Sequence, residues 1–401
     1  MGVRKTLATA CLAIAGISAA MAADPIRIAV TGPYSGPSAP MGQSMLAGVK
    51  IAADEINLGG GLFGRTIELV AKDDKGDPEA AKQVVQEAIQ KDKAVAALGF
   101  INTGVALAAQ KYYQDARIPV INNVATGVKV TRQFLPPEQK ENYIFRNSAS
   151  DVIQAAAIAR EAVERRKFTR VAIFHDETPY GVFGKDQLLQ ELARFDVKPV
   201  SIAKFPVGTA DMSAALKEAK EAGAQAILTY ALGPDLAAIA NGRAKMGWMV
   251  PMIGSWTLSL PNFLEAAGKN AEGARMPQTF VEEANNSRRT GFISAYHNVN
   301  KTKRIPSAVS AAQGYDSLYL LMAAMFQAGG TEGPKIRAAL ESLQKPVYGV
   351  VTVYDQPFTA DDHEAISDNM VVMGEVKNGR IVYAYADEER RSLVVQKKQR
   401  K

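Results

Sequence analysis

The chain has 401 residues, of which 47% are hydrophobic and 22% charged, with a net charge of +6. This length normally forms two domains, and the apolar content with its evenly spread charges excludes a disordered chain. Lys and Arg alternate with Asp and Glu and form no basic stripe, so nucleic acid is not an expected partner.

The first residues predict export. Arg4 and Lys5 precede an apolar stretch over 7–20, and Ala20-Met21-Ala22 places small residues where a signal peptidase reads them. This pattern is typical of a secretory signal at 1–22, cut just after Ala22, which gives a periplasmic protein. The apolar stretch is shorter than the roughly 20 residues of a membrane span. Because Cys11 lies inside the signal, we expect no disulfide and no cysteine nucleophile.

Strands and helices alternate from the start of the mature chain. Short apolar strands bounded by glycine predict parallel sheets covered on both faces by helices. The first run of strands is expected at 26–30, 67–71, 95–100 and 118–121, with helices at 42–56, after Pro78 and at 103–116. Asp73-Asp74 is interpreted as exposed charge after the second strand.

The same alternation begins again after 143–146. Strands are expected at 170–175, 200–205, 226–230 and 252–254, and helices at 155–165, 183–195, 212–222 and 236–245. A long helix is expected at 310–328 and hairpin strands at 350–382. Two such runs predict an α/β protein with two doubly wound parallel-sheet lobes.

The sequence contains no expected catalytic or metal site. His175, His297 and His363 are far apart, and no Gly-x-Ser-x-Gly elbow occurs. The turn at 32–37 lacks the Lys-Ser/Thr ending of a phosphate loop. We therefore expect neither an enzyme nor a cofactor.

Polar and aromatic residues follow several strand ends. They are Tyr34-Ser35, Asn102-Thr103, Val124-Ala125-Thr126 and Pro179-Tyr180-Gly181. Ligands of open α/β sheets bind beyond the carboxyl ends of the strands, where helix N-termini attract anions. The pattern favours an anion site, although Thr103 and Thr126 could equally be ordinary N-caps.

The order of several motifs resembles the leucine/isoleucine/valine-binding family of periplasmic proteins, which serve ABC importers. These motifs are 28–36, Gly48-Val49-Lys50, Asp73-Asp74, His175-Asp176 with Tyr180-Gly181, and Gly314-Tyr315-Asp316. The resemblance covers essentially the whole mature chain. It implies a type I fold in which ligand binds in a cleft between the lobes, and permease subunits in the inner membrane as partners.

The resemblance also implies the lobe boundaries and three hinge crossings. Lobe 1 would comprise 23–146 and 277–367, and lobe 2 would comprise 147–276 and 368–390. The crossings are expected near 146–150, 273–279 and 365–370. Residues 391–401 form a basic tail, which we expect to be flexible.

The family's site residues correspond here to Tyr34, Asn102, Thr103, Val124, Ala125, Thr126 and Tyr180. Two positions depart from the family, because those that hold the ligand's α-ammonium correspond to Leu232 and Trp256. A buried ammonium needs an anionic or hydrogen-bonding partner, which Leu and Trp cannot supply.

The departure leads to competing predictions for the ligand. The first is an organic acid with an apolar or aromatic body, stacked on Trp256 and held by Thr103 and Thr126. The second is an amino acid whose ammonium is bound by Asp176, Glu177 or Asp235. A third possibility is the ligand-binding component of a sensor. Trp256 could also simply fill the core of its lobe, which would remove the argument for an apolar ligand.

Overall fold

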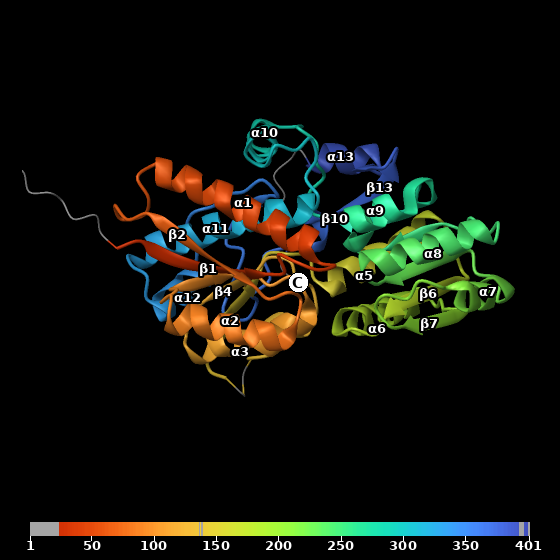
Figure 1. Cartoon of the computed structure of the whole chain (residues 1–401), viewed down its shortest axis with the longest axis horizontal. Coiled ribbons are helices and arrows are strands. Elements are labelled where there is room, and N and C mark those ends of the chain that lie inside the picture. Colours follow the sequence, from red (N-terminus) through yellow and green to blue (C-terminus); the bar gives the residue numbers. More distant parts are fainter. Residues whose placement is uncertain (1–23, 136, 138, 393–396, 400–401) are drawn as a thin grey trace, which may run out of the picture.

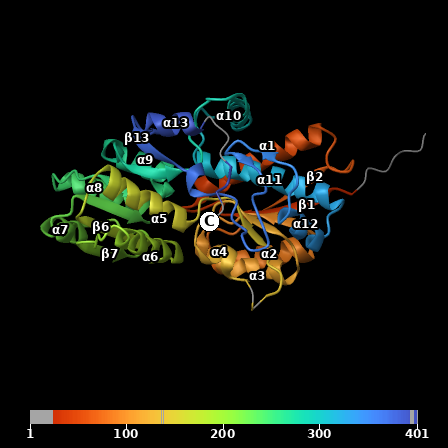
Figure 2. The ribbon, with the colours of Figure 1, turned by 180° about the vertical axis from the view of Figure 1, so that it is seen from behind.

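The computed structural model describes residues 24–135, 137, 139–392 and 397–399. The expected signal and its cut after Ala22 lie outside this part of the chain. No helix within the described residues is long and apolar enough to cross a membrane. Figures 1 and 2 show two lobes side by side, each built around its own sheet.

The first lobe contains a parallel five-stranded sheet in the order β2-β1-β3-β4-β5. Successive residues of β1 face opposite sides, so Ile28 and Val30 join the core under α1 and α11, and Ala29 joins the core under α2 and α3. The strands are β1 (Ile26–Gly32), β2 (Ile67–Asp73), β3 (Ala96–Leu98), β4 (Val120–Asn122) and β5 (Ile144–Arg146). The helices are α1 (Ala39–Leu58), α2 (Pro78–Gln90), α3 (Thr103–Asp115), α4 (Lys129–Arg132), α11 (Ala308–Ala328) and α12 (Gly333–Leu340).

The second lobe contains a seven-stranded sheet in the order β14-β13-β10-β9-β8-β6-β7. Five strands are parallel, whereas β13 and β14 form an antiparallel hairpin at one edge. Asn378-Gly379 makes its turn, with both residues at positive φ, as a tight hairpin requires. The strands are β6 (Val171–Asp176), β7 (Ser201–Phe205), β8 (Ala226–Tyr230), β9 (Met252–Gly254), β10 (Arg275–Gln278), β13 (Val372–Lys377) and β14 (Arg380–Tyr383).

Helices cover both faces of the second sheet. Ala172 and Phe174 of β6 face α7, α8 and α9, while Val171 and Ile173 face α5 and α6. The helices are α5 (Asp151–Ala159), α6 (Pro179–Ala193), α7 (Ser213–Glu221), α8 (Gly233–Lys245), α9 (Pro261–Ala267) and α13 (Ala386–Ser392). The predicted fold class of two doubly wound lobes is therefore confirmed.

The chain passes between the lobes after β5, after β10 and before β13. The crossing after β10 leads to α10 (Ser287–Asn300), whose Phe292 and Tyr296 pack in the core of the first lobe. The segment before β13 follows a short hairpin of β11 (Val347–Tyr348) and β12 (Val353–Tyr354) in that lobe.

The described part of the basic tail differs from the flexible end expected from its charge. The side chain of Lys398 is only 6% exposed, and its ammonium donates to the carbonyl of Pro357 and to a carboxylate oxygen of Asp362. Gln399 N also donates to Ser367 Oγ at 3.0 Å. A lysine between a carbonyl and a carboxylate has its donors satisfied away from water. Lys398 is thus held against the protein, whereas the side chain of Lys397 is 79% exposed, as its charge suggests.

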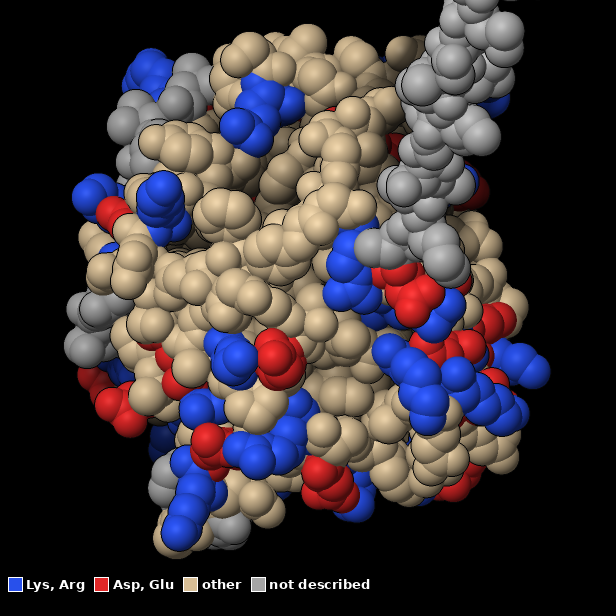
Figure 3. Space-filling view, turned by 90° about the vertical axis from the view of Figure 1, so that its left-hand side faces the viewer, with Lys and Arg blue, Asp and Glu red and all other residues tan. Residues whose placement is uncertain are grey.

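The surface mixes charges of both signs. On the end of the first lobe shown in Figure 3, Lys and Arg lie interspersed with Asp and Glu over the lower half of the view. Among the described residues visible on this face, charges of one sign do not form a separate patch.

Candidate functional site

A cavity of about 330 Å3 lies between the lobes, beyond the carboxyl ends of both sheets. Its walls come from the loops after β1, β2, β3 and β4 in the first lobe and after β6, β7, β8 and β9 in the second. Parallel strands bring their carboxyl ends to one edge, so residues distant in sequence converge there.

The N-terminus of α3 forms part of the first-lobe wall. Asn102, Thr103, Gly104 and Val105 line the cavity, and no side chain caps the helix. The first α3 amide with a helical acceptor is that of Ala106, which donates to Asn102 O at 2.9 Å. The amides before it face the cavity side of the helix end, where the helix dipole favours negative charge.

Two hydroxyls beside this helix end can donate to a ligand. Thr103 Oγ1 accepts from Gly127 N at 3.1 Å, and Ser38 Oγ accepts from Asn102 Nδ2 at 3.1 Å. Both bonds use the hydroxyl oxygen as an acceptor and leave its proton available. Asn102 Oδ1 is buried and has no hydrogen-bond partner among the described residues.

The second-lobe wall is apolar and held in place by a short polar chain. Tyr180 donates to Ser255 Oγ at 2.6 Å, Ser255 pairs with Thr257 at 2.9 Å, and Thr257 donates to Ala231 O at 2.8 Å. Burial raises the pKa of Tyr180 well above its usual value, so this ring stays a neutral phenol.

Trp256 and Leu232 line the same wall. Trp256 is 7% exposed, and its amide donates to Gln154 Oε1 at 3.1 Å. The indole borders the cavity and packs with the first-lobe core. It is absent from the two core clusters of its own lobe, so the alternative that Trp256 fills the core of that lobe is not what the described residues show.

The structure brings most of the predicted site residues to the cavity, but not Tyr34 or Ala125. Tyr34 turns back on its own strand and donates from its hydroxyl to Val30 O at 2.7 Å. The Ala125 methyl group packs in the core under α3, and its amide donates to Phe100 O. The remaining predicted residues line the cavity: Asn102, Thr103, Val124, Thr126, Tyr180, Leu232 and Trp256.

Lys75 also lines the cavity, as an exposed lysine at its mouth, and was not among the residues predicted from the sequence. Its backbone has φ of 55°, and its amide donates to Asp73 Oδ1 at 2.9 Å. Asp73 also accepts from Tyr34 N and Ser35 Oγ, so this carboxylate shapes the loop. These hydrogen bonds outweigh desolvation and lower the pKa of Asp73.

The interpretation of Asp74 as an exposed charge is wrong. Its side chain is buried, and desolvation, with the nearby charges of Asp73 and Asp77, raises its pKa to about 7. Asp74 Oδ1 accepts from Gly76 N at 2.8 Å, which closes the turn behind Lys75. The chain reverses immediately after β2, so Asp74 lies under the turn rather than on it.

None of the acidic residues considered for an ammonium lines the cavity. The carboxylate of Asp176 accepts from Thr178 N and from Leu232 N at 3.2 Å, and Asp235 accepts from Gly208 N at 2.8 Å. Glu177 is exposed to solvent. These carboxylates organise loops of the second lobe instead.

A different carboxyl lies behind the cavity. Asp151 is fully buried, its amide donates to Thr126 O at 2.9 Å, and neither carboxyl oxygen has a well-formed hydrogen bond among the described residues. Burial raises its pKa to about 7. Tyr230 Oη donates to Asp151 O at 3.4 Å, and the ring of Tyr230 lies 5.3 Å from the ring of Tyr180, so Asp151 is close to the second-lobe wall.

The lobes touch across the cavity. A Cβ built on Gly104 would lie 3.2 Å from Cγ of Pro179, at the start of α6. Asn262 Nδ2 donates to Pro37 O at 3.2 Å, and the Lys129 ammonium lies 5.3 Å from the centre of the Phe183 ring. These contacts join the two lobes beside the cavity.

A cavity closed between the carboxyl ends of two doubly wound sheets defines a two-lobed solute-binding protein. The periplasmic binding protein family model matches residues 25–380, and the chain belongs to this family. The leucine-, isoleucine-, valine-, threonine- and alanine-binding protein of Pseudomonas aeruginosa is 26% identical over 336 residues, which cover 83% of this chain and 87% of that protein.

Solved structures of other binding proteins have the same fold. A type 1 periplasmic binding protein from Bordetella pertussis Tohama I is 26% identical with a TM-score of 0.80, covering 90% of this chain and 99% of that one. An R. palustris ABC-transporter solute-binding protein is 19% identical with a TM-score of 0.77, covering 90% and 95%.

The predicted membership of the leucine/isoleucine/valine-binding group and the two-lobed type I fold are confirmed. The chain is a periplasmic binding protein, and its family consists of binding proteins rather than enzymes.

Proposed function

We propose that this protein captures a small organic acid with an apolar or aromatic body and delivers it to the permease subunits of an ABC importer. The observation that carries the proposal is the charge of the cavity wall. Among the described residues that line it, Lys75 is the one cation, and there is no Asp or Glu.

A wall of this charge favours an anion over a zwitterion. The carboxylate of the ligand would lie at the N-terminus of α3, with Thr103 and Ser38 as donors and Lys75 as the counter-charge. An α-ammonium would face the apolar second-lobe wall, where burying it without a partner costs several kcal/mol, of order 2 or more.

The body of the ligand would lie against the second lobe. Trp256, Tyr180 and Leu232 offer aromatic and aliphatic surface there, with Met41 and Ile101 opposite. An aromatic ring stacked on an indole gains roughly 0.5–1.5 kcal/mol beyond its buried area. Two R. palustris proteins with this fold were solved in complex with 4-hydroxybenzoate and with benzoate, which supports an acid of this kind as the ligand.

Amino acids remain a second candidate because of Asp151. This carboxyl is buried beside Thr126 and lacks a well-formed hydrogen bond, which is the environment of a group that could accept an ammonium. The fold also accommodates such ligands, since a Streptococcus pneumoniae protein of the same fold was solved with isoleucine.

Matched ligand pairs test the proposal. Ligand-stripped protein is titrated calorimetrically with leucine against 4-methyl-2-oxopentanoate, and with phenylalanine against phenylpyruvate and benzoate. The two oxo acids keep the side chain of the amino acid and carry a carbonyl in place of its ammonium, and benzoate keeps only the aromatic ring and the carboxylate. We expect binding of the deaminated acids alone. Binding of the amino acids alone would overturn the organic-acid proposal and support Asp151 as the ammonium partner.

A further inference from the structure

A second cavity, of about 280 Å3, lies between the lobes and shares no lining residue with the ligand cavity. Its walls are the start of α10, the loop between β11 and β12, the crossing before β13, and parts of β14 and α13. In Figure 1, α10 and α13 lie at the top of the molecule, whereas α3 and α6, beside the ligand cavity, lie at the bottom.

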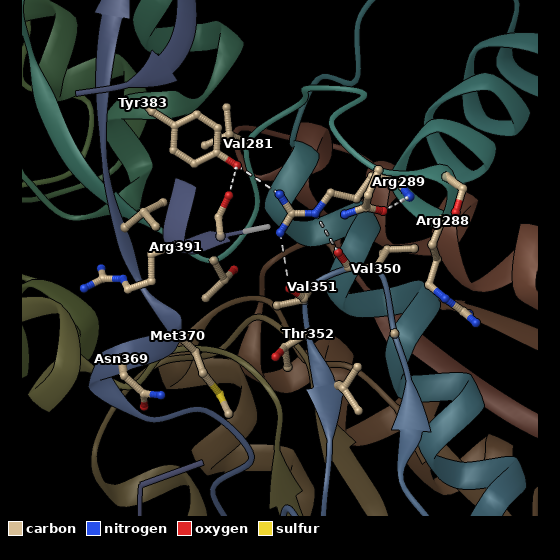
Figure 4. A pocket seen from close by; sticks show the side chains of 17 residues that line it. Val281, Arg288, Arg289, Val350, Val351, Thr352, Asn369, Met370, Tyr383 and Arg391 are labelled. Carbon is tan, nitrogen blue, oxygen red and sulfur yellow. Dashed lines mark hydrogen bonds between the residues drawn. The ribbon is translucent and has the colours of Figure 1, made fainter. Parts of the chain in front are cut away.

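The charged residues that line this cavity, among those described, are all basic. Arg288, Arg289 and Arg391 line it, and none of its described lining residues is Asp or Glu. Figure 4 shows Arg289 in the middle, with Arg391 and Arg288 on opposite sides of it. Arg288 is exposed, and Arg391, also exposed, donates to Val371 O at 3.2 Å.

Arg289 is the buried member of the three and is only 4% exposed. Its Nε donates to Val350 O at 3.1 Å, its Nη2 to Val351 O at 3.3 Å, and its Nη1 to Tyr383 Oη at 2.9 Å and Asn285 Oδ1 at 3.5 Å. A guanidinium has five N–H donors, so one on Nη2 remains. All these acceptors are neutral.

A buried guanidinium without an anion retains much of its desolvation cost. Burial raises the pKa of Glu283, and the charge of Arg289 offsets only part of that effect. Within the described part of the chain, the Arg289 guanidinium donates to neutral acceptors and not to this carboxylate. The cavity in front of Arg289 therefore offers space for the missing counter-charge.

We propose that this hinge-side cavity binds a small oxyanion with two negative charges, of the phosphate class. Arg289 contributes the buried charge, and the exposed side chains of Arg288 and Arg391 close over the anion from either side. Arginine suits this role because its planar donors match the spacing of oxyanion oxygens. Because Arg289 belongs to the first lobe and Tyr383 to the second, a bound anion would contact both lobes.

Calorimetric titration with inorganic phosphate at constant ionic strength tests the site. We expect saturable binding that weakens roughly tenfold or more in the double variant Arg288→Gln, Arg391→Gln, since each loses a charge-assisted bond. Both side chains are exposed, so the variant keeps the buried contacts of Arg289. The matched control Arg27→Gln, Arg194→Gln removes the same charge elsewhere and should bind as the unmodified protein does.

Three results would overturn the site: no saturable phosphate binding, equal weakening in the control variant, or equal affinity for acetate, which carries one charge. The variant Lys75→Met distinguishes phosphate binding in the second cavity from phosphate binding in the ligand cavity. We expect this variant to bind phosphate normally, and loss of phosphate binding would instead assign the anion to the ligand cavity.

Discussion

Arg146 and Glu364 form an ion pair that joins the crossing after β5 to the segment before β13. Nε of Arg146 lies 2.7 Å from Oε2 of Glu364, and Nη2 lies 2.5 Å from Oε1. Arg146 is 1% exposed and Glu364 23%. Arg146 Nη1 also donates to Gly127 O at 2.8 Å, so the same guanidinium positions the loop that carries Thr126.

Glu364→Gln should lower the free energy of unfolding by about 3 kcal/mol, because it leaves the buried guanidinium without its anion. Chemical denaturation measures the change. Glu68→Gln serves as the control, since it breaks the exposed pair with Arg27 and should cost less than about 1 kcal/mol. Equal losses in the two variants would show that the hinge pair contributes no more than a surface pair.

Lys75→Met should weaken binding of the organic acid roughly tenfold while leaving thermal stability unchanged, because Lys75 is exposed and supplies only the counter-charge. The effect should shrink as salt rises, since a charge at the cavity mouth is screened. Lys91→Met, at the far end of α2, is 74% exposed in its side chain and removes the same charge away from the cavity. Unchanged affinity in Lys75→Met would remove Lys75 from the site.

Gly104→Val should weaken ligand binding by holding the lobes apart. The new side chain would meet Pro179, since even a Cβ at this position approaches it to 3.2 Å. Relieving such an overlap costs about 1–3 kcal/mol of closure free energy, or roughly tenfold in affinity. Small-angle scattering with ligand should show a larger radius than the unmodified protein. Gly291→Val in α10 is the control, because no atom lies within 4 Å of its Cβ.

The pH dependence of binding should depend on Asp151. Burial raises its pKa from 3.8 to about 7, so the folded protein holds a proton that the unfolded chain has already released. Binding of this proton adds to the free energy of unfolding at pH values below the pKa of Asp151 in the unfolded chain. The contribution is lost as the pH rises through about 7, the pKa of Asp151 in the folded protein. Above that pH, the ionised carboxylate should also repel an anionic ligand.

Asp151→Asn should therefore flatten both pH profiles. Three other buried carboxyls have raised pKa values: about 7 for Asp74, about 6 for Asp176 and about 7 for Asp316. They are present in the unmodified protein and in the variant alike, so the difference between the two pH profiles is due to Asp151. Stability and calorimetric affinity are measured on either side of pH 7. An affinity that rises with pH in the unmodified protein and is lost in the variant would instead indicate a cationic ligand group at Asp151.

The alternation of strands and helices predicted both lobes, because binary patterning decides which elements can form a covered sheet. Element ends were less predictable. The helix expected from residue 42 begins at Ala39, since Pro40 is tolerated in a first turn, and the helix expected from 155 begins at Asp151. The hinge packing that buries Asp151 involves segments far apart in the chain, which local patterns do not reveal.

The site was predictable in outline, because the loops after parallel strands converge at one edge of the sheet. Asn102, Thr103 and Thr126 reach the cavity because the ends of β3 and β4 determine their positions. Lys75 was missed because its direction depends on a left-handed backbone and on the hydrogen bonds of Asp73. Tyr34 follows β1 as expected, yet its hydroxyl prefers the carbonyl of Val30, a choice that the sequence pattern does not show.

The placement of Trp256 also gives the protein an optical signal of its own. The chain has two tryptophans, and only Trp256 borders the ligand cavity, whereas Trp248 packs at the edge of the second-lobe core. Emission from Trp256 should therefore change when the cavity fills, against a steady background from Trp248. An aromatic acid stacked on the indole should quench this fluorescence more strongly than an aliphatic acid of equal affinity. The emission of the unlabelled protein should therefore distinguish aromatic from aliphatic ligands.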